Sequence, residues 1–159
     1  EAIATYTARA SEKLRLQNQR AGAITVFARS SPFSANFYNK YATKRLNIPS
    51  NSTTILLEQA MRLTEQVFNP ERSFTKAGVL LQKLQGINHL QQHLFENFDE
   101  TKDIRNENLM NTIDNLNEKY GPKTITWAIC GSNPTWTMRQ NQLSHNSTTR
   151  LSDIPITKA

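Results

Sequence analysis

The spacing of hydrophobic residues along the chain predicts helices and strands in turn. Apolar positions that recur every three or four residues predict a helix over residues 3–20, and a second helix that begins after Asn51 or Ser52 and ends before Pro70. Either Asn51 or Ser52 can cap that second helix by accepting a free backbone N–H. Alternation of apolar and polar residues predicts strands over residues 22–30, 42–48 and 73–82, with a polar and aromatic loop over 34–41 between the first two.

The second half of the chain is less regular. No period persists over residues 85–105, which are predicted to form a linker. A third helix is expected over residues 106–119, followed by a short strand over 124–129 and a polar tail that begins at Gly131. The apolar stripe of the third helix is expected to consist of Leu109, Ile113 and Leu116.

The order α-β-β-α-β indicates an α+β fold, in which an antiparallel sheet carries two helices on one face and leaves the other face open. If the apolar residues of the strands face the helices, then Arg29, Arg45 and Lys76 point out of the open face together. A cationic sheet face suits the phosphate backbone of a nucleic acid. The alternative is that these long side chains only keep the face soluble.

Composition and charge narrow the class of protein. The chain has 159 residues, about one domain, and a formal net charge of +6. Residues 1–49 contain eight basic and two acidic side chains, so the excess of the first third equals that of the whole chain. Concentrated positive charge is typical of a polyanion-binding protein, although a solvated basic face without a partner would have the same charge.

Several kinds of chemistry are not supported by the sequence. Cys130 is the only cysteine, which excludes an internal disulfide and a Cys-x-x-Cys zinc site. His89 and His93 are spaced like metal ligands, but convincing third and fourth ligands are missing, and no third group orients a Cys130–His145 nucleophile. We therefore expect no metal and no catalytic residue. Without an apolar run of membrane length or a signal-peptide pattern after Glu1, we expect a cytoplasmic chain. Because the sequence does not begin with methionine, we expect it to be a piece of a longer protein.

Three runs of residues resemble the C-terminal part of the UmuC family, the Y-family translesion polymerases that are the catalytic subunits of bacterial DNA polymerase V. These runs are Tyr6–Arg15 (YTARASEKLR), Val26–Phe33 (VFARSSPF) and Phe74–Leu81 (FTKAGVLL). Residues 136–155 are similar to the tail of this family, except that His145 and Ser147 replace its usual proline and aromatic residue.

The resemblance implies a division of the chain into three parts. Residues 1–84 would be the DNA-binding little finger domain, with its first strand upstream of Glu1. Residues 85–105 would be a linker, and residues 106–159 the C-terminal region of unknown role. The polymerase carboxylates and their Mg²⁺ ions would also lie upstream, so this piece would not be an enzyme by itself and would need no cofactor.

The resemblance also implies site residues on the sheet. Arg29, Ser30, Thr75 and Lys76 would follow the phosphates of template and primer. The small Gly78 would let the strand backbone come close to them. With Arg45 from the sheet pattern, these residues form the predicted DNA-binding set.

A second predicted site lies in the linker. Residues 91–95 (QQHLF) fit the pattern Gln-x-x-Leu-Phe with which bacterial polymerases bind the sliding clamp, and this family carries its motif at the same place. Leu94 and Phe95 would fill an apolar cleft, and the Gln91 amide can donate and accept hydrogen bonds. An amphipathic linker that packs on its own domain is the alternative reading.

Two functions from different classes follow. The first is a DNA-binding and clamp-binding module of a polymerase in SOS mutagenesis and DNA repair, whose C-terminal region either braces the little finger or engages UmuD′ or the recombinase filament. The second is a stand-alone basic module that binds RNA through exposed aromatic residues such as Phe37, Tyr38 and Tyr41.

Overall fold

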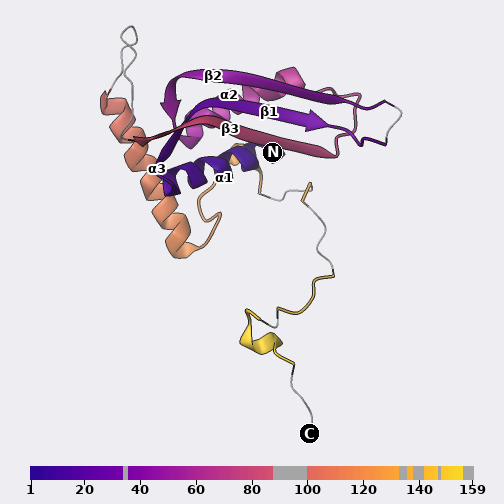
Figure 1. The fold of residues 1–159 in the computed structure, drawn as a ribbon. Coiled ribbons are helices and arrows are strands. Elements are labelled where there is room, and N and C mark those ends of the chain that lie inside the picture. The colour runs from indigo at the N-terminus through magenta and orange to yellow at the C-terminus, as the bar shows by residue number, and fades with distance from the viewer. Residues whose placement is uncertain (34–35, 88–99, 133–135, 138–141, 147, 156–159) are drawn as a thin grey trace.

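The computed structural model describes residues 1–155 apart from 34–35, 88–99, 133–135, 138–141 and 147 (Figure 1). Three helices and three strands occur in the described part of the chain, together with two short 3₁₀ helices. In order they are α1 (Ala2–Leu16), β1 (Gln19–Arg29), β2 (Asn39–Ser50), α2 (Thr53–Val67), β3 (Lys76–Gly86), α3 (Glu100–Tyr120), η2 (Ala128–Cys130) and η3 (Leu151–Asp153).

The three strands form one antiparallel sheet in the order β2-β1-β3 (Figure 1). β1 is central, and its residues Ile24 and Val26 are buried in one cluster with side chains from both α1 and α2. Both helices therefore cover the same face of the sheet, and the predicted α+β class is confirmed. The core residues of this cluster are Ile3, Leu14, Ala21, Ile24, Val26, Leu56, Ala60 and Leu63.

The first helix ends earlier than predicted. α1 stops at Leu16, and Asn18 has a positive φ of 52°, a left-handed conformation that asparagine tolerates better than most residues. Arg20, which the apolar pattern places in the helix, is instead the second residue of β1 and is buried. The turn at Asn18 therefore directs the Arg20 side chain into the protein.

The observed boundaries of β2, β3 and α3 differ less from the predicted ones. β2 begins at Asn39, inside the expected loop, β3 runs from Lys76 to Gly86, and α3 begins at Glu100, inside the expected linker. Ser52 is the N-cap residue of α2, but its side chain makes no capping hydrogen bond.

The strand expected over residues 124–129 is wrong. Residues 124–125 form a bend and η2 begins at Ala128, because the backbone groups of Thr124 and Ile125 already have other partners. The Asn117 side chain accepts a hydrogen bond from the Ile125 N–H at 2.8 Å and donates one to the Ile125 carbonyl at 3.0 Å. Thr124 donates to the Gly121 carbonyl from both its N–H and its hydroxyl. A side chain of α3 thus replaces the neighbouring strand that a sheet would supply.

Candidate nucleic-acid interface

The sheet is basic throughout. β1 contributes two basic residues, β2 three and β3 two, and none of these three strands contains an acidic residue. Arg20 is the exception among them, because it is buried and paired with α3. For the other six, no carboxylate in the described part of the chain lies within ion-pair distance. They are Arg29, Lys40, Lys44, Arg45, Lys76 and Lys83.

Strand register places two of the predicted site residues side by side. Arg29 pairs with Lys76 across β1 and β3, and with Asn39 across β1 and β2. Directly paired residues point to the same face of a sheet. Since Ala28 and Val26 face the helices, Arg29 and Lys76 lie together on the open face, as the sequence predicted.

Arg45 lies on the same face but farther away. It pairs with Ala23, six residues along β1 from Arg29. At about 3.4 Å per residue, this separation is about 20 Å. The predicted set therefore forms a cationic pair at one end of the sheet and a single arginine toward the other.

Ser30 and Thr75 are tied to the backbone at the end of β1. The buried Ser30 hydroxyl accepts a hydrogen bond from the Tyr38 N–H at 2.8 Å. Thr75 donates to the Arg29 carbonyl from its N–H at 2.9 Å and from its hydroxyl at 3.4 Å. Both residues thus fix the strand end that carries Arg29. Thr75 is also exposed, whereas the Ser30 side chain is not.

Gly78 lies against the Phe27 ring, whereas its small size was expected to serve the approach of DNA phosphates. A Cβ atom at this position would lie 2.7 Å from two ring atoms of Phe27, its partner across β1 and β3. That distance is below any real contact, so the glycine makes room for the Phe27 ring, an arrangement in which an aromatic side chain covers a strand glycine. The backbone at Gly78 is therefore covered from the open face instead of being free to approach phosphates.

The predicted clamp motif, with Gln91, Leu94 and Phe95, lies outside the described residues, as do His89 and His93. Within the described residues, no group of three or more His, Cys, Asp or Glu side chains could hold a metal ion. Cys130 is buried. No helix among these residues has the length and apolar character that a membrane crossing requires.

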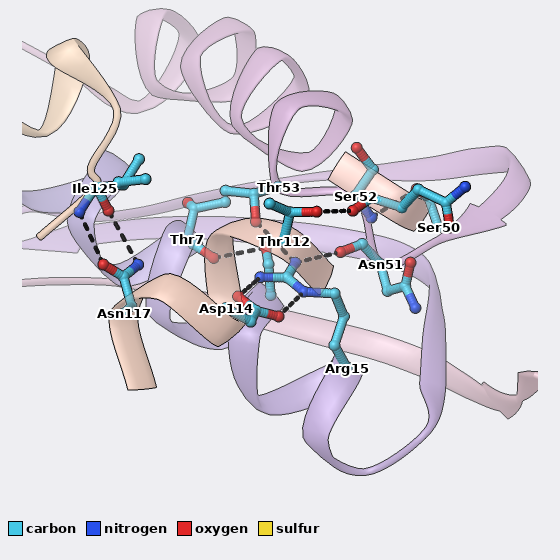
Figure 2. A network of polar contacts seen from close by, with 12 residues as sticks. Thr7, Arg15, Ser50, Asn51, Ser52, Thr53, Thr112, Asp114, Asn117 and Ile125 are labelled. Atoms are coloured by element: carbon cyan, nitrogen blue, oxygen red, sulfur yellow. Dashed lines mark hydrogen bonds and ion pairs between the residues drawn. The ribbon is translucent and has the colours of Figure 1, made fainter. Parts of the chain in front are cut away.

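A polar network on the helix side of the sheet was not foreseen (Figure 2). Arg15 of α1 binds both carboxylate oxygens of Asp114 on α3, at 2.6 and 2.8 Å. The same guanidinium donates to the Asn51 carbonyl at 2.8 Å and to the Thr53 hydroxyl at 2.9 Å. Its side chain is only 7% exposed. Arg15 therefore joins α1, the start of α2 and α3.

Arg20 makes a second link to α3. Its guanidinium donates to Asp103 at 2.9 Å and lies 3.9 Å from Glu107. Residues 103, 107 and 114 of α3 are separated by four and seven positions, so they share one face of this helix. This acidic face is the sequence signal for the network, and it is not part of the apolar pattern of the helix.

The docked face of α3 is thus not the predicted apolar stripe. Met110, which lies between Glu107 and Asp114 on the docked face, is buried. Leu109, from the predicted stripe, is half-exposed, and Ile113 and Leu116 are partly buried. α3 is thus held to the domain by two buried arginines together with the buried Met110 side chain.

Comparison with known proteins identifies the class to which this fold and basic sheet belong. Residues 1–94 match the model of the impB/mucB/samB family C-terminal domain, and residues 107–156 match a domain of unknown function (DUF4113). The chain belongs to the impB/mucB/samB family, which confirms the resemblance seen in the sequence.

Three relatives are similar to this chain along nearly its whole length. It is 32% identical to protein ImpB of Salmonella typhimurium over 160 residues, which cover 99% of this chain and 37% of ImpB. It is 31% identical to protein UmuC of Salmonella typhimurium strain LT2, over 97% of this chain and 36% of that protein. Protein MucB of Escherichia coli is 31% identical over 98% of this chain and 36% of that protein. The chain therefore spans a little over a third of the length of these relatives.

Proposed function

We propose that this chain is the C-terminal part of an error-prone Y-family DNA polymerase, and that its open sheet face binds the DNA backbone without regard to sequence. In this proposal residues 1–84 are the DNA-binding little finger, 85–105 the clamp-binding linker and 106–159 the C-terminal region. Catalysis and its Mg²⁺ ions belong to the rest of the longer protein. Family membership supports the polymerase context, which the stand-alone RNA-binding alternative lacks.

The observation that carries the DNA-binding proposal is the distribution of charge. Arg15 and Arg20 are neutralised inside the protein, whereas Arg29, Arg45 and Lys76 share an open face with no carboxylate of the described residues beside them. Phosphate contacts of this kind fix the position of a protein on DNA and carry no sequence information. A polymerase that holds damaged DNA needs this kind of contact.

The test is the affinity of the chain for two duplexes of unrelated sequence, measured by fluorescence anisotropy over a range of salt concentrations. Three phosphate contacts predict a slope of log K against log[salt] of about −2.7, the same for both duplexes. A slope near zero, or a strong preference for one sequence, would contradict the proposal.

The linker is proposed to tether the protein to the sliding clamp. Changing both Leu94→Ala and Phe95→Ala removes the two apolar anchors of the motif and is expected to abolish clamp binding. Surface plasmon resonance on an immobilised bacterial sliding clamp measures the loss, and DNA binding of the same variant is the control, since it is expected to persist. Clamp binding that survives the double change would exclude residues 91–95 as the motif.

The C-terminal region is proposed to brace the little finger, one of the two roles that the sequence left open. The contacts of two arginines with α3 support this role. Arg15 joins α3 to α1 and to the start of α2, and Arg20 joins α3 to β1. UmuD′ and the recombinase filament are proposed as partners of the longer protein, as is the clamp.

A further inference from the structure

We infer that the open sheet face, two residues in from the end that carries Arg29 and Lys76, is a stacking site for an unpaired nucleobase of single-stranded DNA. This inference rests on the proposed DNA-binding function and adds a ligand that phosphate contacts alone do not select. Two aromatic side chains of neighbouring strands, Tyr41 and Phe27, form the site.

The first argument is the register of the strands. Tyr41 pairs with Phe27, which in turn pairs with Gly78, so these three residues form one row across the sheet. The Phe27 ring lies over Gly78, where a Cβ atom would clash with it. The row therefore presents an aromatic surface that spans the sheet and has no side chain at its β3 end.

The second argument is exposure. Tyr41 is 72% exposed, and its hydroxyl makes no hydrogen bond within the described part of the chain. Leu80, two residues beyond Gly78 on β3, is half-exposed. By contrast, Tyr38 packs edge-on against Phe74 and donates its hydroxyl hydrogen to the Val67 carbonyl at 2.8 Å. Tyr38 is thus a structural aromatic residue, and Tyr41 is available to a ligand.

The third argument is the position of the cations. Arg29 and Lys76 lie two residues from the aromatic row, about 7 Å along the strands, and Arg45 lies four residues away in the other direction, about 14 Å. Sites for single-stranded nucleic acid combine aromatic platforms with cations that follow the backbone. A stacked base on Tyr41 would have cations on both sides for its neighbouring phosphates.

A stacking platform selects unpaired DNA because the faces of bases inside a duplex are already covered by their neighbours. An aromatic side chain on a sheet can reach the face of a base only where the DNA is single-stranded. The site would therefore hold an unpaired stretch of template, while duplex binding depends on the cations alone.

The test compares Tyr41→Ala with Tyr120→Ala, which removes a tyrosine that is 63% exposed on α3 and absent from the sheet. Binding to a dT oligonucleotide and to a duplex hairpin is measured by fluorescence anisotropy. Tyr41→Ala is expected to weaken single-strand binding by about 5- to 100-fold and to change duplex binding less than twofold. Tyr120→Ala is expected to change neither.

A base analogue gives a direct readout of stacking. The fluorescence of 2-aminopurine within a dT oligonucleotide is expected to fall on binding to the unchanged chain and to Tyr41→Phe, which keeps the ring, but not to Tyr41→Ala. If Tyr41→Ala weakens both DNA forms equally, or neither, the stacking site is wrong and the phosphate-binding proposal stands. If the unchanged chain binds neither form, the proposed function fails and the inference fails with it.

Discussion

Arg15→Ala is expected to lower the free energy of unfolding by about 3 kcal/mol, because it breaks a largely buried ion pair and leaves its partners behind. The Asp114 carboxylate, with a side chain only 22% exposed, would lose both of its short hydrogen bonds to the guanidinium. The Asn51 carbonyl and the fully buried Thr53 hydroxyl would also lose a donor. Chemical denaturation followed by circular dichroism measures the change.

The chain offers a matched control for this prediction. Arg62 forms a salt bridge of 2.7 Å with Glu58 on the surface of α2, where the Arg62 side chain is 69% exposed. Arg62→Ala is expected to reduce stability by at most about 0.5 kcal/mol, because an exposed pair four residues apart gains little in water. Equal losses for the two variants would show that the Arg15 contacts do not stabilise the domain.

The loss of Arg15 is also expected to act locally. Among the residues that the structure describes, α3 without the Arg15 guanidinium keeps the contacts of Arg20 with Asp103 and Glu107 as its charged links to the domain. Amide hydrogen exchange should then become faster along α3 than along β1, because a helix docked through polar contacts can open without unfolding the core. This pattern would separate a bracing role of α3 from a general loss of stability.

Residues with strong local patterns could be predicted from the sequence. Ile24, Val26, Leu56, Ala60 and Leu63 alternate or recur with a clear period, and all of them lie in the core. The segment over residues 124–129 also alternates in part, but a strand needs a neighbour, and the Asn117 side chain already occupies the Ile125 backbone groups. This competition involves a side chain eight residues before Ile125, so the alternation within the segment does not show it.

The site was predicted only in part, because a local pattern does not show how the strands pair. Periodicity placed Arg29, Arg45 and Lys76 on one face, but only the register shows that Arg29 and Lys76 are neighbours and that Arg45 is not. The role expected for Gly78 depended on its small size alone, and the pairing with Phe27 supplies another reason for that size. The α3 docking was missed because buried ion pairs have no apolar signature.

The combined change Arg29→Ala, Arg45→Ala and Lys76→Ala is expected to weaken duplex binding by about 500-fold at 0.1 M salt. Each neutralised phosphate contributes about 0.9 to the salt slope, which corresponds at 0.1 M salt to about an 8-fold gain in affinity. The gains from three contacts multiply to about 500-fold. The slope itself should fall by about 2.7. Fluorescence anisotropy at several salt concentrations measures both quantities on one duplex.

A second triple variant separates the sheet face from net charge. Arg9, Lys13 and Lys119 are exposed on α1 and α3, so replacing them by alanine removes the same charge from the helix side of the protein. This control is expected to change duplex affinity only slightly at 0.1 M salt, because charges more than a Debye length of about 10 Å from the DNA are largely screened. If both triple variants lose affinity equally, net charge binds the DNA and the open sheet face is not the interface. If only the sheet variant loses it, the unpaired cations of the strands are the contact with the phosphates.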